Sequence, residues 1–293
     1  MQKVVLFCKS FRDDVLRVRR LIESVARFNT DGLSLYLAVP TSDVPLFREK
    51  CDGLAFNLLT DEEVIAANPK LDSGVFAQLP GRVSQQIVKS EFWRLGLGEA
   101  YVCVDSDCHF LRAFRAADFL SADGTPYTVM HESKELLHFA ELSGMAQIAG
   151  NWKRDSEDMK RIFGREGRSW DFGPVPVVWS ARVWEDLDEK FLRARGMTFL
   201  DAITLHPGEL RWYGEALLAF GSIPILPIEP LFRCYHYEEQ YHFWKRLGET
   251  EDMVARNYLG VCLQSNWDKD LDLVKRFRFS KLRRRIRRAI KGY

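Results

Sequence analysis

The sequence predicts an α/β fold in which helices cover a mixed, mostly parallel sheet. Through the first half of the chain, short apolar runs of strand length alternate with segments of helical periodicity, which is the pattern of a parallel sheet. The chain has 293 residues, of which 46% are hydrophobic, and this is enough to bury a sizeable core. No internal repeat or low-complexity linker divides it, so we expect one Rossmann-like domain followed by a C-terminal extension.

The elements of the first half follow from these runs and from the residues that break them. The first helix has apolar residues at spacings of three and four between Val15 and Phe28, and Gly32 lies past its end. The last strand of this half begins at Tyr101, soon after Gly96 and Gly98. The expected order is strand 3–8, helix 12–28, strand 33–39, helix 43–50, strand 54–59, helix 83–97 and the strand from 101.

The second half is less regular. Prolines punctuate residues 223–230, and because proline cannot donate to a sheet we expect an edge strand or an extended loop there. The other expected elements are strand 126–131, helix 155–163, the short apolar run 175–179 and helices 181–195 and 208–220.

Cysteine usage and hydropathy exclude several protein classes. The six cysteines are scattered and include no C-x-x-C pair, so we expect neither a disulfide framework nor a zinc site. The first apolar run, 4–8, is far too short for a signal peptide, and no window approaches the length of a membrane span. We therefore expect a protein of the reducing cytoplasm.

The net charge of +1 hides an asymmetry. Residues 275–293 contain ten Lys or Arg and no acid, so the remainder carries 32 basic and 41 acidic residues, a net charge of −9. Apolar residues of this tail fall on one side of a predicted helix, and arginines cover the rest. A basic amphipathic helix is typical of docking to an anionic membrane surface, with nucleic-acid binding or a disordered solubility tail as alternatives. The predicted membrane contacts are Arg283, Arg284, Arg287 and Arg288.

The most informative segment is Asp105-Ser106-Asp107, which follows the apolar run 101–104. Parallel sheets keep their chemistry at the carboxyl ends of strands, and two carboxylates there can converge on a hard divalent cation. The alternative is a simple turn, because Asp and Ser hydrogen-bond their own backbone well. The triplet alone leaves both readings open.

The order and spacing of several segments resemble the nucleotide-sugar-dependent glycosyltransferases of the A-type fold, in particular a poorly characterised bacterial family. The resemblance rests on 7–11 with Asp13, 85–89, 104–107, 173–180, 212–215, 235–237 and 263–267. It implies a catalytic domain over 1–267, with a nucleotide-sugar half (1–112) and an acceptor half (113–267), and a basic extension over 268–293. It also implies transfer from a nucleoside-diphosphate sugar, most simply a UDP-sugar, to a glycan or lipid-linked acceptor in bacterial surface-polysaccharide synthesis.

The resemblance further implies roles for individual residues. Asp107, Asp105 and His236 would hold Mn²⁺ or Mg²⁺, which acts as a Lewis acid on the departing diphosphate. Glu215, or Asp171 as second choice, would take the proton of the acceptor hydroxyl. Trp93, Trp179 and Trp212 could stack on sugar rings, although most tryptophans fill core. The implied donor-binding residues are Lys9, Ser10, Asp13, Gln85, Gln86, Lys89, Asp105 and Ser106.

Rival functions fit the residues less well. A haloacid-dehalogenase-type phosphatase would expect its Asp-x-Asp on the first strand and Thr or Val at position 109, which is His here. A glycosidase would place its two carboxylates on different elements rather than two residues apart. In the non-enzymatic alternative, the tail binds nucleic acid or a membrane and the α/β body is only a scaffold. We expect nucleic acid to be the less suitable partner, and a cytoplasmic enzyme that docks on the inner membrane to be the better description.

Overall fold

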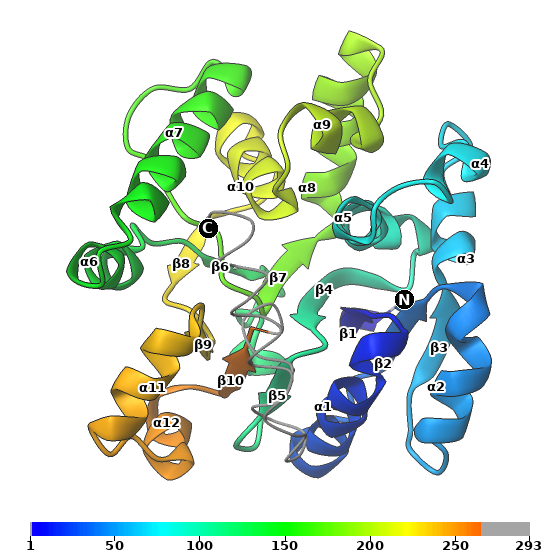
Figure 1. Ribbon diagram of the computed structural model, residues 1–293. Helices are drawn as coiled ribbons and strands as arrows, with labels where there is room; N and C mark the ends of the chain where they lie inside the picture. The colour runs from blue at the N-terminus through cyan, green and yellow to red at the C-terminus, as the bar shows by residue number, and fades with distance from the viewer. Residues whose placement is uncertain (1, 265–293) are drawn as a thin grey trace, which may run out of the picture.

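A five-stranded, mostly parallel sheet forms the centre of the protein (Figure 1), and the computed structural model describes residues 2–264. The strand order is β3-β2-β1-β4-β7, in which the first four strands are parallel and β7 is antiparallel to β4. This confirms the predicted mixed, mostly parallel α/β class. The bounds are β1 Gln2–Lys9, β2 Leu35–Val39, β3 Asn57–Thr60, β4 Gly98–Asp105 and β7 Val177–Ser180.

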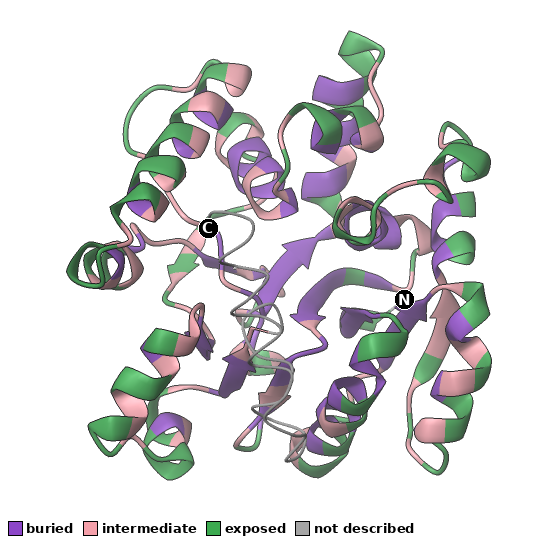
Figure 2. Cartoon of the chain, viewed as in Figure 1, coloured by how far each residue is buried: buried purple, intermediate pink, exposed green. Residues whose placement is uncertain are grey.

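Helices cover both faces of this sheet. Right-handed crossovers from β1 to β2 and from β2 to β3 place α1 and α2 on one face, and the return from β3 to β4 places α5 on the other (Figure 1). In Figure 2, strands β1, β4 and β7 are mostly buried, and the helices that cover the sheet carry both buried and exposed residues. The helices around the sheet are α1 Val15–Phe28, α2 Val44–Lys50, α3 Asp61–Ala66, α4 Ser73–Phe76, α5 Gly81–Glu91 and α8 Ala181–Asp186. A π-helical segment, Leu187–Leu192, continues α8.

Two small sheets and six helices complete the described chain. One sheet has the order β5-β10-β9, with β5 antiparallel and β9 parallel to β10, and the other pairs β6 with β8 in parallel. Their strands are β5 Cys108–Phe110, β6 Tyr127–Val129, β8 Leu226–Ile228, β9 Phe232–Tyr235 and β10 Gly260–Leu263. The helices are α6 Lys134–Leu142, α7 Ala146–Phe163, α9 Phe199–Leu205, α10 Glu209–Phe220, α11 Glu238–Arg246 and α12 Glu251–Asn257.

Aromatic side chains fill the core between the sheet and its helices. Phe7 of β1 stacks on Phe92 with ring centroids 3.9 Å apart, and Trp179 of β7 packs edge-on against Tyr101 of β4. Trp179 and Trp212 are completely buried. The suggestion that these two tryptophans stack on sugar rings is therefore wrong, because their faces are covered by protein.

One close approach explains a glycine inside a helix. A Cβ atom added to Gly214 of α10 would lie 2.1 Å from the ring of Phe172, so only glycine lets the helix backbone meet this ring. Phe172 belongs to the segment between α7 and β7 that also holds Asp171. The contact thus holds this segment against α10.

The strand order places a switch point between β1 and β4. The chain leaves β1 towards β2 on one side and later returns to β4 on the other, and Lys9 is the register partner of Asp105. In open α/β sheets, ligands bind in the crevice outside such strand ends. The expected donor-binding residues at the ends of β1 and β4 therefore share one edge of the sheet.

The structure differs from the expected elements in where one strand ends and in several elements that were not expected. The run from Tyr101 ends its strand at Asp105, turns at Ser106 and Asp107, and continues as β5 in a different sheet. Strands β9 and β10 and helices α3, α4, α6, α9, α11 and α12 were not expected. The predicted tail helix and its four arginines lie outside the described residues, and the domain boundaries remain predictions.

Candidate functional site at the switch point

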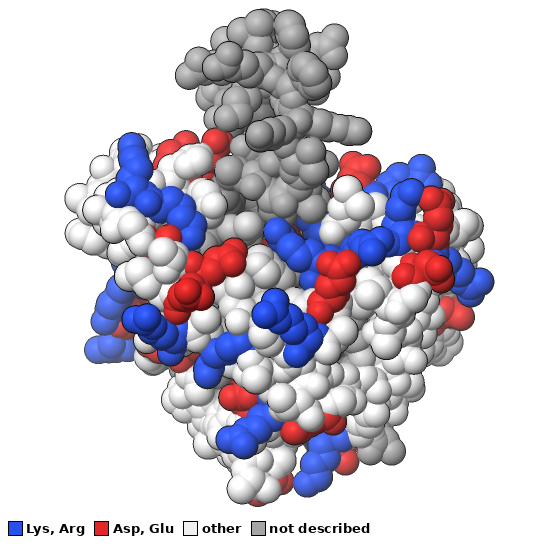
Figure 3. All heavy atoms as spheres, turned by 90° about the horizontal axis from the view of Figure 1, so that it is seen from below, with Lys and Arg blue, Asp and Glu red and all other residues white. Residues whose placement is uncertain are grey.

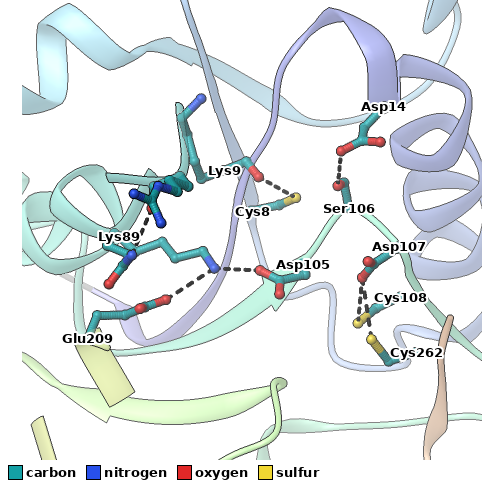
Figure 4. A network of polar contacts seen from close by, with 12 residues as sticks. Cys8, Lys9, Asp14, Lys89, Asp105, Ser106, Asp107, Cys108, Glu209 and Cys262 are labelled. Atoms are coloured by element: carbon teal, nitrogen blue, oxygen red, sulfur yellow. Dashed lines mark hydrogen bonds and ion pairs between the residues drawn. The ribbon is translucent and has the colours of Figure 1, made fainter. Parts of the chain in front are cut away.

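Two buried lysines face carboxylates at the switch point (Figure 4). Lys89 of α5 lies 2.6 Å from Asp105 Oδ1 and 3.3 Å from Glu209 Oε1. Burial alone would lower the pKa of Lys89, but Asp105 and Glu209 outweigh it and raise the pKa well above its usual value. The ammonium group is therefore charged and buried, and it joins α5, β4 and the first residue of α10.

The second lysine ends β1. Lys9 Nζ lies 2.9 Å from Asp61 Oδ2 and donates to the carbonyl oxygen of Ser10 at 2.5 Å. Burial raises the pKa of Asp61 to about 6, although the ammonium group of Lys9 opposes this shift. Asp61 is the first residue after β3, so three of the four parallel strands, β3, β1 and β4, bring charged side chains to the same edge of the sheet.

Asp105 and Asp107 face different partners rather than each other (Figure 4). Asp105 is directed to Lys89, and its side chain is 28% exposed. Asp107 is buried, and its Oδ1 lies 3.3 Å from Cys262 Sγ and 3.9 Å from Cys108 Sγ. Between them, the hydroxyl of Ser106 donates to Asp14 Oδ2 at 3.1 Å, so the triplet both forms a turn and carries ordered polar contacts.

The other expected donor-binding residues take mixed positions. Gln86 Oε1 accepts a hydrogen bond from the backbone N–H of Gly208 at 2.8 Å, which ties α5 to the start of α10. Gln85 and Asp13 are exposed, whereas Asp14, which sequence reasoning passed over, is buried against Ser106. Ser10 is buried next to Lys9.

A cavity of about 440 Å³ lies in the second half of the chain, between the ends of β6 and β8, α6 and β9. His131, Trp170, Arg233, Cys234 and His236 are among its lining residues. Cys234 also contacts Cys262, and the thiol of Cys262 donates a hydrogen bond to Asp107. Only these two cysteine side chains therefore separate the cavity from the turn that holds Asp107.

Asp171 stands beside this cavity. Its carboxylate accepts hydrogen bonds from the Ser133 hydroxyl and, at 3.0 Å, from the backbone N–H of Gly173. Ser133 lines the cavity and has a φ of 53°, a left-handed conformation unusual for serine. Burial lowers the pKa of His236, but Cys234, Asp171 and Glu135 together raise it above its ordinary value. Asp171 and His236 therefore share one local electrostatic environment.

Glu215 is held in a different place. Its carboxylate is buried on α10 and forms a two-pronged ion pair with Arg165, at 2.5 Å from Nε and 2.8 Å from Nη2. Arg165 also donates to the carbonyl oxygens of Glu166 and Arg168. This arrangement neutralises Glu215, which is therefore a weaker candidate for a proton acceptor than Asp171.

The expected metal ligands are not brought together. Within residues 2–264, a single set of three His, Cys, Asp or Glu donors comes within 4.8 Å of one another, and it is Asp107, Cys108 and Cys262. Neither Asp105 nor His236 belongs to it. Two sulfur donors and one oxygen do not fit Mn²⁺ or Mg²⁺, which prefer oxygen ligands. This set of residues is therefore not an Mn²⁺ or Mg²⁺ site.

Sequence reasoning missed four residues of this region: Asp14, Asp61, Glu209 and Cys262. Asp61 had a signal, because an acid directly after a strand lies at the same sheet edge as Lys9. Glu209 had one as well, because it opens a helix after Gly208. Cys262 had none, since β10 was not expected.

Comparisons with known proteins bear on the family. Among curated proteins, none matches the chain. Among solved structures, the apo form of mouse xyloside xylosyltransferase 1 is similar over 90% of this chain and 98% of that one, with a TM-score of 0.46 and 10% sequence identity. A similarity this weak does not establish a shared fold or activity. The sequence model of DUF6492, a family of unknown function, matches residues 4–220. This match spans more than half of the sequence, and the chain therefore belongs to the DUF6492 family.

Proposed function

We propose that this protein is a glycosyltransferase that moves a sugar from a nucleoside-diphosphate sugar to a hydroxyl group of a glycan or lipid-linked acceptor. The observation that carries the proposal is the pairing of Lys9 with Asp105 across the switch point, with Lys89 against Asp105. Nucleotides bind at this place in open α/β sheets. The sequence resemblance to A-type glycosyltransferases points to the same edge of the sheet.

The charges at this edge suit a departing diphosphate. When the bond between the anomeric carbon and the diphosphate oxygen breaks, negative charge grows on that oxygen, and a fixed ammonium group stabilises it. Lys89 carries such a group, and the diphosphate would share its charge with the carboxylates of Asp105 and Glu209. Asp105 is partly exposed and is suited to accept hydrogen bonds from ribose hydroxyls.

The acceptor half would contribute the cavity beside Asp171. In the proposed reaction, the acceptor oxygen bonds to the anomeric carbon while its proton passes to a carboxylate. Asp171 adjoins the cavity, whereas Glu215 is neutralised by Arg165, so we assign this role to Asp171.

Binding of nucleoside diphosphates tests the proposal. We expect UDP or another nucleoside diphosphate to raise the melting temperature in the presence of EDTA, and the matching nucleoside to have little effect. Loss of a hydrogen bond to a charged group costs about 1.5 to 3 kcal/mol, so Lys89→Met should weaken nucleotide binding roughly 10- to 150-fold. The exposed Lys153 gives a matched control, since Lys153→Met should bind as the wild type does.

Two further measurements separate loss of binding from loss of folding and from metal dependence. Circular dichroism of Lys89→Met shows whether it is folded, and Lys89→Arg, which keeps the charge, should recover part of the affinity. Repeating the titration with Mn²⁺ in place of EDTA tests metal dependence. If no nucleoside diphosphate stabilises the protein under either condition, the donor-site proposal fails.

No observation within the described residues favours the rival functions. Basic and acidic side chains are interspersed on the face in Figure 3, which offers no single-sign surface for nucleic acid. The first strand, where the phosphatase family keeps its nucleophile, ends in Lys9 rather than aspartate. No helix within residues 2–264 has both the length and the apolar character needed to cross a membrane.

A further inference from the structure

Three thiols from distant parts of the chain lie in one row across the sheet β5-β10-β9. Cys262 of β10 is the register partner of Cys108 on β5 and of Cys234 on β9, so all three side chains point to the same face. All three are buried. The backbone N–H of Leu263 donates to Asp107 O at 3.0 Å, which makes the neighbouring pair of Cys108 and Cys262 a non-hydrogen-bonded one, where side chains approach most closely.

The row ends in further metal-binding groups on both sides. Asp107 Oδ1 lies 3.3 Å from Cys262 Sγ and 3.9 Å from Cys108 Sγ (Figure 4). At the other end, His236 Nδ1 lies 3.8 Å from Cys234 Sγ. Five residues that commonly bind metals thus form one connected cluster, although they come from three separate segments.

The separations match those of a tetrahedral site. With metal–ligand bonds of about 2.0 to 2.3 Å, the ligand atoms of a tetrahedral zinc site are about 3.3 to 3.8 Å apart. The distance of 3.3 Å from Asp107 Oδ1 to Cys262 Sγ lies at this spacing, and the distance of 3.9 Å to Cys108 Sγ is slightly longer. Cys234 contacts Cys262 but is not among the donor atoms that lie within 4.8 Å of one another, so its side chain would have to turn toward the cation to become the fourth ligand.

We propose that Asp107, Cys108 and Cys262, with Cys234 as the fourth ligand, form a binding site for a thiophilic divalent cation such as Zn²⁺. Binding replaces the three thiol protons, which pass to solvent, by metal–sulfur bonds, and the Asp107 carboxylate supplies the fourth bond without proton release. His236 would lie next to the bound Cys234 sulfur and could donate a hydrogen bond to it.

This site does not depend on the proposed glycosyltransferase activity. Its effect would be structural: it would fasten the turn after β4 to β9 and β10, and thereby fix one wall of the switch-point crevice. No sequence pattern predicts this site, because Asp107 and Cys108 are far along the chain from Cys234 and Cys262.

Cobalt binding tests the proposal directly. The untagged full chain, reduced and stripped of metal, is titrated with Co²⁺, whose sulfur-to-cobalt charge-transfer absorption reports thiolate ligands. We expect one Co²⁺ per chain with this absorption and its displacement by one equivalent of Zn²⁺. A roughly 100-fold excess of Mn²⁺ should not displace it, because Mn²⁺ binds most weakly in the divalent series.

Variants locate the site. Cys108→Ala with Cys262→Ala should abolish the absorption, whereas Cys51→Ala and Cys103→Ala, which remove buried thiols elsewhere, should keep it. If the double variant does not fold, the single Cys234→Ala variant should still shift the spectrum by replacing one sulfur ligand. Absence of thiolate absorption in the reduced wild type, its persistence in the double variant, or equal competition by Mn²⁺ would each overturn the proposal.

Discussion

We predict that the ion pair between Arg165 and Glu215 is structural and that its two partners are unequal. The side chain of Glu215 is 4% exposed and that of Arg165 is 15% exposed. Water therefore compensates each charge less than in a surface pair, and each charge relies on its partner for stabilisation. Removing one partner of a buried pair costs about 3 to 5 kcal/mol, because the other charge is left without compensation.

The surroundings of the two groups set the expected order. In Arg165→Met, the buried Glu215 carboxylate loses both of its hydrogen bonds from Arg165, and we expect a loss of about 4 kcal/mol in the free energy of unfolding. In Glu215→Gln, the amide oxygen can still accept a hydrogen bond, and Arg165 keeps the carbonyl oxygens of Glu166 and Arg168. We therefore expect a smaller loss of about 2 kcal/mol.

Urea unfolding followed by circular dichroism measures these losses, provided that the dependence on urea stays unchanged. Arg161→Met is the matched control, since Arg161 forms an exposed pair with Asp158 and should lose less than about 1 kcal/mol. In the double variant Arg165→Met with Glu215→Leu, the unfolding free energy should recover above that of Arg165→Met alone. If Glu215→Gln were as stable as wild type, and Arg165→Met no worse than the control, the pair would not be structural and Glu215 would be available as a base.

Three other outcomes are expected. Because burial raises the pKa of Asp61 to about 6, the protonated carboxyl group stabilises the folded state fully below about pH 4, and this contribution is lost as the pH rises through about 6. The unfolding free energy of wild type relative to Asp61→Asn should therefore fall by about 3 kcal/mol across that range. A difference that does not change with pH would contradict the shift. Gly214→Ala places a Cβ 2.1 Å from the Phe172 ring. The resulting strain of about 1 to 3 kcal/mol outweighs a helix-propensity gain of about 1 kcal/mol, so the melting temperature should drop. No drop would mean that the ring moves freely. Replacing the four predicted membrane-contact arginines by glutamine should weaken sedimentation with anionic vesicles by up to about 4 kcal/mol at low salt, and unchanged sedimentation would argue against membrane docking.

The first half of the fold was predictable because its signals are local. Apolar runs such as 3–8 and the periodic helix after Arg12 determine their own structure, and chain order then gives a mostly parallel sheet. The strands β9 and β10 were missed because their pairing is decided by contacts far along the chain, β10 with both β5 and β9.

The candidate site was predictable only where a charged residue directly follows a strand. Lys9 and Asp105 are such residues, and their neighbourhood follows from the strand order. The orientation of side chains was not predictable: Asp105 and Asp107 are two residues apart but turn to different partners, because the chain changes sheets between them. Likewise, nothing local indicates that Arg165 neutralises Glu215 across fifty positions.

The pairing of Cys262 with Asp107 has a consequence for the order in which the protein can mature on the ribosome. These residues are 155 positions apart, and Leu263 also donates a hydrogen bond to the Asp107 carbonyl oxygen. Strands β1 to β4 emerge early and can pair with one another, but the turn that follows β4 gains its partners only when β10 has left the exit tunnel. In a nascent chain, strands β1 to β4 would therefore stand without the partners of this turn for more than half of the synthesis.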